Sequence, residues 1–340
     1  MKKIVVTGGS GFIGTNLVNY LLKKKIFVIN IDNLSYASNK YNKFAENNKN
    51  YRFYKTNIGN KKKIKGILNK YKPECIFNLA AETHVDRSID QPLNFIETNI
   101  LSTFNFLETV RSLYKQRPIK LIHISTDEVY GDLKPGLRSS EEFPYNPSSP
   151  YAASKASSDL LIKSYIRTYK FPAIITNCCN NYGPFQFPEK LLPKMISNIL
   201  NNKVLPIYAK GKNSREWIFV EDHCEALFNI YKKGKIGQCY NIGSGYNLDN
   251  LSLILKLINQ IKQTNFKIGK NVKIKFVKDR PGHDIRYALN NNKIRKQLKW
   301  KAKTNITTGL KKTIAWYIQN PKFLSTIPKK LYNNRLGLQI

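Results

Sequence analysis

One segment near the N-terminus restricts the fold more than any other. The apolar run "KKIVVTG" predicts a β-strand, "GTNLVNYLLKK" predicts a helix, and "TGGSGFIG" (7–14) joins them. Glycines at 8, 11 and 14 permit a tight turn and let the backbone approach a pyrophosphate, while the helix N-terminus supplies N–H groups and the positive end of its dipole. The segment therefore predicts a dinucleotide-binding unit.

Strand and helix patterns then alternate through the first half of the chain. Strands are predicted at "IFVINID", "ECIFNLAA", "IKLIHIST" and "PAIITNC", and helices over "KIKGILNKY", 93–113 and 151–169. This alternation predicts an α/β protein with a Rossmann-type, doubly wound parallel sheet. Later helices are predicted near 250–262 and 306–319, in a less regular last third.

The change in pattern predicts two domains. We expect residues 1–180 to form the NAD-binding Rossmann domain, with later segments near 215–245 returning to it. Residues 181–340 are expected to form mainly a smaller, mixed α/β domain that binds the substrate.

An acid at the end of the second predicted strand indicates which dinucleotide binds. Asp32 stands where a carboxylate accepts hydrogen bonds from both ribose hydroxyls. The same carboxylate would repel a 2′-phosphate, so the sequence favours NAD over NADP.

The composition indicates which other classes of function can be excluded. The net charge is +35, but lysines are scattered along the chain and no nucleic-acid-binding motif accompanies them. We therefore expect a solvated basic surface that attracts an anionic substrate, and no nucleic-acid partner. The five cysteines are odd in number and lack zinc-ligand spacing, which predicts reduced thiols in a cytoplasmic protein and no metal. No run reaches the ~18–20 apolar residues of a membrane span.

"YAASK" (151–155) places Tyr151 and Lys155 four residues apart, on one face of a predicted helix. A phenol ordinarily titrates near ~10. A neighbouring ammonium, together with a positive nicotinamide ring, would lower the pKa of Tyr151 and make it a base toward a sugar hydroxyl.

These motifs resemble the extended short-chain dehydrogenase/reductase family, whose members act mostly on nucleotide sugars, and the resemblance covers nearly the whole chain. Within that family, "STDEVYG" (125–131) is similar to the dTDP-glucose 4,6-dehydratases, which have Thr-Asp-Glu at this place. "NLAAETHVDRSI" (78–89), "NNYGPFQFPEKLLP" (180–193), "REWIFVEDH" (215–223) and "DRPGHDIRYA" (279–288) are similar to the same group.

The resemblance implies a reaction that needs two acids. C4 of the glucose is oxidised, water is eliminated across C5–C6, and hydride returns to C6, giving a 4-keto-6-deoxy sugar for dTDP-rhamnose or a related polysaccharide sugar. Paired acids with different pKa values suit the elimination. The implied roles are Glu128 as the C5 base, Asp127 as the C6 acid and Thr126 as a hydrogen-bond donor near O4. Tyr151 acts at O4 and Lys155 orients the ribose.

The resemblance also implies the binding residues. Beside the glycines, those for NAD are Phe12, Ile13, Asp32, Asn33, Leu34, Ser35, Asn57, Ile58, Ala80, Ala81, Glu82, Thr98, Tyr151, Lys155 and Asn181. Those for dTDP-glucose are His84, Thr126, Asn180, Lys190, Leu191, Pro206, Ile207, Tyr208, Arg215, Asn250, Asp279, Arg280, Pro281, Gly282 and His283. Asn57 departs from the usual aspartate there, which removes a charge from the adenine contact.

Two structural expectations follow. Neighbouring side chains of a regular strand point to opposite faces, so Asp127 and Glu128 flank one sugar only if the backbone becomes irregular at 127–128. The long helices 93–113 and 151–169 have enough apolar positions for a four-helix homodimer interface.

The sequence leaves three alternatives. A nucleotide-sugar 4-epimerase needs Tyr151 and Lys155 but no acid pair. A UDP- or GDP-sugar 4,6-dehydratase differs in the base that it recognises. A catalytically idle Rossmann protein would not need the intact Thr126, Asp127, Glu128, Tyr151 and Lys155.

Overall fold

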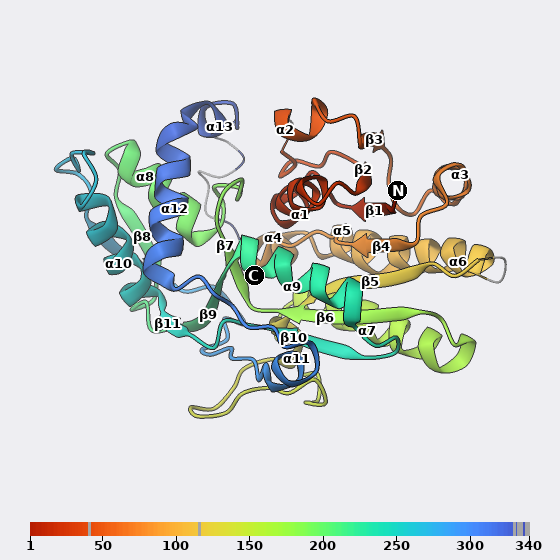
Figure 1. Cartoon of the computed structure of the whole chain (residues 1–340). Coiled ribbons are helices and arrows are strands. Elements are labelled where there is room, and N and C mark those ends of the chain that lie inside the picture. The colour runs from red at the N-terminus through yellow and green to blue at the C-terminus, as the bar shows by residue number, and fades with distance from the viewer. Residues whose placement is uncertain (40–41, 115–116, 329–330, 332–335, 337–340) are drawn as a thin grey trace.

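The structure, a computed structural model, describes residues 1–39, 42–114, 117–328, 331 and 336. A large sheet with helices on both faces occupies one side of the molecule, and a smaller lobe that carries α8, α10 and α12 occupies the other (Figure 1). The predicted α/β class is confirmed.

The large sheet has seven parallel strands in the order β10-β6-β5-β4-β1-β2-β3. The strands are β1 (Lys3–Thr7), β2 (Phe27–Asp32), β3 (Tyr51–Lys55), β4 (Cys75–Asn78), β5 (Lys120–Thr126), β6 (Ala173–Cys178) and β10 (Cys239–Ile242). Strand order reverses between β1 and β4, and ligands of doubly wound sheets bind at the carboxyl ends of the strands beside such a reversal.

Burial on both faces explains why these strands are continuous apolar runs. In β1, Ile4 and Val6 face one core and Val5 faces the other, all with no exposed surface. The first core is covered by α1 (Phe12–Lys23), α9 (Val220–Lys233) and α11 (Asn292–Leu298), and the second by α3 (Lys61–Tyr71), α6 (Ser102–Tyr114) and α7 (Pro150–Tyr169).

The segment predicted as one helix over 93–113 is interrupted. It consists of α5 (Pro92–Phe95), a π-helical turn over Ile96–Leu101, and α6. Inside the turn the buried Asn99 accepts a hydrogen bond from Glu82 N (2.9 Å) and donates to Glu82 O (3.0 Å) and Ser154 Oγ (2.8 Å). These tertiary bonds hold the widened turn, a feature often found at functional sites, and no helical periodicity reveals them.

The predicted helix at 151–169 is confirmed as α7. Ser149 caps it by accepting from Ala152 N, and Pro150 occupies its first turn, where no N–H is required. The short helices α2 (Lys43–Glu46) and α4 (Val85–Asp90) follow β2 and β4.

The smaller lobe has its own core and two small sheets. Its strands are β7 (Asn180–Tyr182), β8 (Leu205–Tyr208), β9 (Ser214–Phe219), β11 (Asn247–Asp249) and β12 (Ile274–Val277), and its helices are α8 (Leu191–Leu200), α10 (Asn250–Lys262), α12 (Ile306–Gln319) and α13 (Pro321–Ser325). Helices α10 and α12 lie where predicted, and the side chains of Asp249 and Asn305 cap them. Leu253, Leu257 and Leu310 are fully buried between them.

In the part of the chain that the structure describes, no helix has the length and apolar character needed to cross a membrane.

Candidate active site

The glycine-rich turn forms a cradle that no larger residue could form. Gly8 has a φ of +67°, and a Cβ there would lie 2.7 Å from Ala80 N. A Cβ on Gly14 would lie 2.0 Å from Gly8 O. The glycine turn thus packs directly against the backbone at Ala80 and against itself. Helix α1 begins at Phe12, so the N–H groups of its first turn lie at the glycine turn. The turn fits a pyrophosphate group.

Asp32 is placed to receive a ribose. It ends β2, is buried, and accepts hydrogen bonds from Ser10 N (3.0 Å), Leu34 N (2.7 Å) and Ser38 Oγ (3.2 Å). Burial raises the pKa of its carboxyl, and these hydrogen bonds oppose the rise. Because the bonds come from both flanking loops, the carboxylate is fixed before a ligand arrives.

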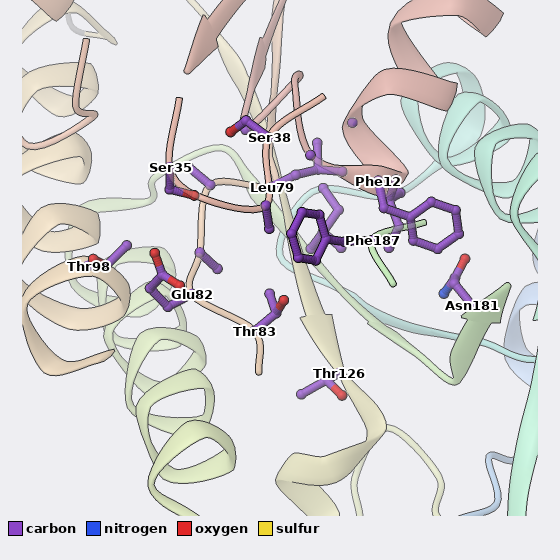
Figure 2. A pocket seen from close by; sticks show the side chains of 18 of the residues that line it. Phe12, Ser35, Ser38, Leu79, Glu82, Thr83, Thr98, Thr126, Asn181 and Phe187 are labelled. Atoms are coloured by element: carbon purple, nitrogen blue, oxygen red, sulfur yellow. The ribbon is translucent and has the colours of Figure 1, made fainter. Parts of the chain in front are cut away.

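A single cavity brings most of the predicted residues together at the carboxyl ends of the strands. Of the predicted residues, those that line it are Gly8, Gly11, Phe12, Ile13, Gly14, Asp32, Asn33, Ser35, Asn57, Ile58, Ala80, Ala81, Glu82, Thr98, Thr126, Asp127, Glu128, Tyr151, Lys155, Asn180, Asn181 and Lys190. Figure 2 shows Phe12, Thr98, Thr126 and Asn181 around this pocket, each from a different element. The cavity lies beside the reversal in strand order.

Other lining residues were missed by the sequence reasoning. They include Tyr36, Ser38, Thr56, Leu79, Thr83, Gln186, Phe187 and Glu189. Most of them lie one to three positions from a predicted residue. They could have been predicted from the general rule that the loops at the carboxyl ends of the strands line the ligand site. Phe187 and Glu189 belong to the quoted "NNYGPFQFPEKLLP" stretch.

The two acids leave the strand together. Strand β5 ends at Thr126, and a 3₁₀ turn over Asp127–Tyr130 follows directly. Thr126 Oγ1 accepts from Glu128 N (3.3 Å) and closes this turn. The predicted irregular backbone at 127–128 is confirmed, and both acids line the same cavity.

The two carboxyl groups have different electrostatic surroundings. Burial, followed by the charges of Glu128 and Glu216, raises the pKa of Asp127 well above its usual range. Burial also raises the pKa of Glu128, but the cations Arg280, Arg215 and Lys190 oppose that rise. Asp127 is therefore held protonated while Glu128 is drawn toward the carboxylate, as an acid and a base require.

Tyr151 and Lys155 line the pocket beside the acids, but their interaction differs from the prediction. Burial, followed by the charge of Glu128, raises the pKa of Tyr151 well above its usual range. The Lys155 ammonium instead donates to Ile124 O (2.9 Å) and lies 3.4 Å from His123 Nε2. Lys155 is not among the groups that shift the pKa of Tyr151, so the predicted lowering by Lys155 does not occur in the protein alone.

A second polar cluster lies at the edge of the smaller lobe. Asp86 accepts from Arg280 Nη1 (2.7 Å) and from Tyr208 Oη (2.7 Å). Arg280 Nε is buried and has no hydrogen-bond partner among the described residues. Arg215 bonds only to main-chain carbonyls in the described part of the chain, those of Ser214, Asp284 and Ile285. Arg215 thus pairs with no carboxylate in the described part of the chain, while Arg280 keeps an unused Nε donor beside its ion pair with Asp86.

Tyr208 and Arg280, both predicted to bind the substrate, bond to Asp86 in this cluster and do not line the cavity. The other predicted substrate residues outside the cavity lining include Leu191, Pro206, Arg215, Asn250, Asp279, Pro281, Gly282 and His283. His283 Nδ1 contacts Asp279 Oδ1 at 2.6 Å, and its ring lies edge-on to Tyr208. Asp86, which joins Tyr208 to Arg280, was not predicted because its partners are distant in sequence.

Three other predicted residues, His84, Ile207 and Leu34, do not line the cavity. His84 is buried and caps α4 by accepting from Arg87 N (3.3 Å), and burial lowers its pKa to about 3. Ile207 alternates with Pro206 and Tyr208 along β8 and faces the core of the smaller lobe. Leu34 does not line the cavity and contributes its N–H to Asp32.

Asn57 lines the cavity where the family usually has an aspartate. Its Oδ1 accepts from Gly59 N (2.7 Å), so the amide keeps the local turn that a carboxylate would make. The substitution therefore changes the charge at this place and not the fold of the loop.

No cluster of three or more His, Cys, Asp or Glu residues suited to a metal ion occurs within residues 1–39, 42–114 and 117–328. All five cysteines are free, and four are buried.

The fold and the site define an extended short-chain dehydrogenase/reductase, a Rossmann enzyme with a tyrosine–lysine pair and a second, smaller lobe. A family model described as GDP-mannose 4,6 dehydratase matches residues 5–313. A probable dTDP-glucose 4,6-dehydratase of Sinorhizobium fredii is 43% identical over 347 residues, covering 99% of each chain.

Solved structures agree with these matches. The dTDP-glucose 4,6-dehydratase of Bacillus anthracis, in complex with NAD, has a TM-score of 0.87 and 38% identity over 96% of this chain and all of its own. That of Streptomyces venezuelae, with NAD and a second ligand bound, has a TM-score of 0.88 and 37% identity over the same shares. The chain belongs to the dTDP-glucose 4,6-dehydratase family.

Proposed function

We propose that the protein is an NAD-dependent hydro-lyase that converts dTDP-glucose to dTDP-4-keto-6-deoxyglucose and water. The acid pair beside Tyr151 and Lys155 carries this proposal, because a 4-epimerase has no step that needs it. The full-length relatives act on dTDP-glucose by name, which favours this nucleotide over UDP or GDP. NAD is the cofactor, as in the related structures.

The cradle and Asp32 would hold NAD at its pyrophosphate and adenosine ribose, and Lys155 would hold the nicotinamide ribose. Bound NAD supplies the oxidant for C4 and the hydride that later reaches C6. Tyr151 removes the O4 proton, and Thr126 hydrogen-bonds near O4. Asn180 and Asn181 flank this place from β7.

Elimination then requires the two acids to act on adjacent carbons. The C4 ketone acidifies the C5 proton, which Glu128 removes as carboxylate. Asp127, held protonated, gives its proton to the departing C6 hydroxyl, so that water leaves. When Glu128 returns its proton to C5, its carboxylate is restored. Asp127 regains the proton that it gave to water by a net transfer of the O4 proton held on Tyr151, which restores both of these groups.

The smaller lobe would bind the nucleotide diphosphate of the substrate. Arg215 and Arg280 offer planar donor groups to the pyrophosphate, and Lys190 adds a third cation beside the sugar. Residues 1–180 with the β10 segment would thus serve as the NAD-binding domain, and 181–340 mainly as the sugar-nucleotide domain.

We also propose a homodimer. Large apolar side chains are exposed along two neighbouring helical segments: Leu93, Ile96, Leu101 and Phe104 on α5, the π turn and α6, and Leu160 and Tyr169 on α7. Leu93 and Leu160 are 64% and 56% exposed. A second copy presenting the same strip would bury it about a two-fold axis in a four-helix interface.

The decisive assay incubates the purified protein with NAD and dTDP-glucose, with UDP-glucose and GDP-mannose in parallel. We expect the 4-keto-6-deoxy product from dTDP-glucose without net accumulation of NADH. Epimerised sugar, or dehydration of only another nucleotide sugar, would reject the proposal. The product would supply a deoxysugar pathway such as that to dTDP-rhamnose.

A further inference from the structure

A buried polar chain lies beneath the tyrosine–lysine pair. His123 on β5 places its Nε2 3.4 Å from Lys155 Nζ and 3.5 Å from Asp159 Oδ1. His123 and Asp159 have at most 1% of their surface exposed. Polar contacts therefore run from the pocket floor into the interior without a break.

The neighbours of His123 determine which nitrogen carries its proton. Asn78 Oδ1 accepts from Thr7 Oγ1 (2.6 Å), so Asn78 Nδ2 is the atom that donates to His123 Nδ1 (3.0 Å). The proton of the neutral ring is consequently on Nε2, which lies near both Lys155 Nζ and Asp159 Oδ1, although Asp159 Oδ1 makes no hydrogen bond within the described residues. Burial, followed by the charge of Lys155, lowers the pKa of His123 well below its usual range and keeps the ring neutral.

Burial raises the pKa of Asp159, and the charge of Lys155 and the donors on its Oδ2 oppose that rise. Its Oδ2 accepts from Ser125 Oγ (2.7 Å), Tyr145 Oη (3.1 Å) and Asn177 Nδ2 (3.3 Å). Three such donors favour the ionised form against the cost of burial. This is a fully enclosed anion, and an enclosed anion requires a cation.

Lys155 is the cation that shares this enclosure. The titratable groups that face Asp159 or Lys155 are Lys155 and Lys163 on α7, His123 on β5, Tyr145 on the following loop, Cys178 on β6 and Cys239 on β10. The charge of Asp159 raises the pKa of Lys155 against the larger lowering by burial. The charge of Lys163 also lowers the pKa of Asp159, but Lys163 is partly exposed on α7.

We propose that Asp159, through the neutral ring of His123, is the buried counter-ion that keeps Lys155 charged and directed toward the cofactor. Both are positioning residues, and the proposal rests on the function proposed above. The Lys155 ammonium donates to Ile124 O, and the His123 ring lies against it on the side of Asp159. Its position and its charge thus depend on groups that never touch the substrate.

The distance between Lys155 and Asp159 determines how far the Asp159 charge shifts the pKa of Lys155. Nζ of Lys155 and Oδ1 of Asp159 are at most about 7 Å apart, since each lies about 3.5 Å from the same nitrogen. At an effective dielectric constant of about 20, unit charges at that separation change a pKa by roughly one to two pH units. Loss of the Asp159 charge should therefore make Lys155 lose its proton that much earlier as the pH rises.

The test measures NAD affinity against pH by titration calorimetry, on the full-length protein and on Asp159→Asn. Where Lys155 deprotonates, its contribution to NAD binding is lost. We expect affinity in Asp159→Asn to fall at a pH one to two units below the fall in the wild type, and the alkaline limb of kcat/KM for dTDP-glucose to move equally. NAD affinity needs no sugar, so a failure of the proposed function would leave this readout intact.

The controls separate positioning from folding. Asp222→Asn changes another buried carboxylate, which accepts from Lys303 N and Thr304 N on the outer side of α9, and should leave the pH dependence unchanged. His123→Leu leaves the Asp159 charge in place and should shift the pH profile less than Asp159→Asn does. A wild-type pH profile in Asp159→Asn would overturn the proposal. If Asp159→Asn does not fold, Asp159→Ser, which is smaller and also uncharged, takes its place in the same measurement.

Discussion

Replacing Asp127 by asparagine should stabilise the fold while it removes the dehydration step. Asp127 is 3% exposed, its Oδ1 accepts from Thr126 Oγ1 (3.3 Å), and its Oδ2 has no hydrogen-bond partner within the described residues. Its pKa is raised by burial and by Glu128 and Glu216. Asparagine has nearly the shape of the protonated acid and carries no charge to bury.

The sign of the stability effect follows from proton linkage. In the unfolded chain Asp127 loses its proton near pH ~4, whereas the folded protein retains it until a higher pH. The unfolded state therefore gains stability from ionisation as the pH rises between the two pKa values, and the folded wild type loses stability. Asparagine has no such loss, so its advantage appears above about pH 4 and grows until the folded pKa is reached.

The magnitude scales with the difference between the two pKa values. Each pKa unit corresponds to about 1.4 kcal/mol. For a chain of 340 residues with an unfolding entropy of about 2.1 cal/mol/K per residue, that equals about 2 °C in Tm. Because the elimination loses its acid, we expect turnover to fall by about 10²- to 10⁴-fold.

Two measurements on the same protein check this reasoning. Scanning calorimetry at a series of pH values should give Asp127→Asn a Tm advantage that increases from pH 4 toward neutrality. Stopped-flow absorbance should show enzyme-bound NADH accumulating, because C4 oxidation proceeds while elimination is slow. A variant that is less stable at neutral pH, with a difference independent of pH, would refute the assignment of Asp127 as a buried neutral acid. Glu128→Gln is the contrast, since the cations around it lose their partner and no stabilisation is expected.

Three further predictions test other parts of the site. Tyr151→Phe should reduce turnover by at least about 10²-fold without any NADH accumulation, since it acts before oxidation, and the same stopped-flow assay checks this. Gly14→Ala should weaken NAD binding measured by calorimetry, because its Cβ would lie 2.0 Å from Gly8 O; Gly66→Ala, with no atom within 4 Å in α3, is the control and should stabilise the helix by about 0.5–1 kcal/mol. Leu160→Glu should shift sedimentation from dimer to monomer, whereas a dimeric Leu160→Glu protein, or a monomeric wild type, would reject the proposed interface.

Local features of the sequence were sufficient for much of the architecture. The apolar runs at Lys3–Thr7 and Lys120–Thr126 are buried on both faces, so they had to be strands of a covered parallel sheet. The glycines at 8 and 14 are needed by backbone contacts that any larger side chain would break. The acid pair could be recognised from the sequence because two carboxyl groups directly follow a predicted strand, at the edge of the sheet where ligands bind.

Other features depend on contacts between residues that are distant in the sequence. The π turn at Ile96–Leu101 is held by the bonds of Asn99 to Glu82 and Ser154. The Nδ1 of His84, a residue predicted to approach the substrate, caps α4, and the sequence did not indicate that cap. Asp86 forms an ion pair with Arg280, which is 194 positions away in the sequence. No local sequence pattern predicts such a pair.

The difference between the features that the sequence predicted and those that it did not has one physical origin. The sequence by itself determined the elements, the nucleotide cradle and the chemical types present at the site, because periodicity, chain reversal and reactive groups are local properties. Only the tertiary structure decided the charge state of each group. Burial raises the pKa of Tyr151, and different charged neighbours act on the pKa values of Asp127 and Glu128. The fold also places His123 between Lys155 and Asp159. Desolvation and charge coupling depend on which distant segments surround a group, and those neighbours exist only once the chain has folded.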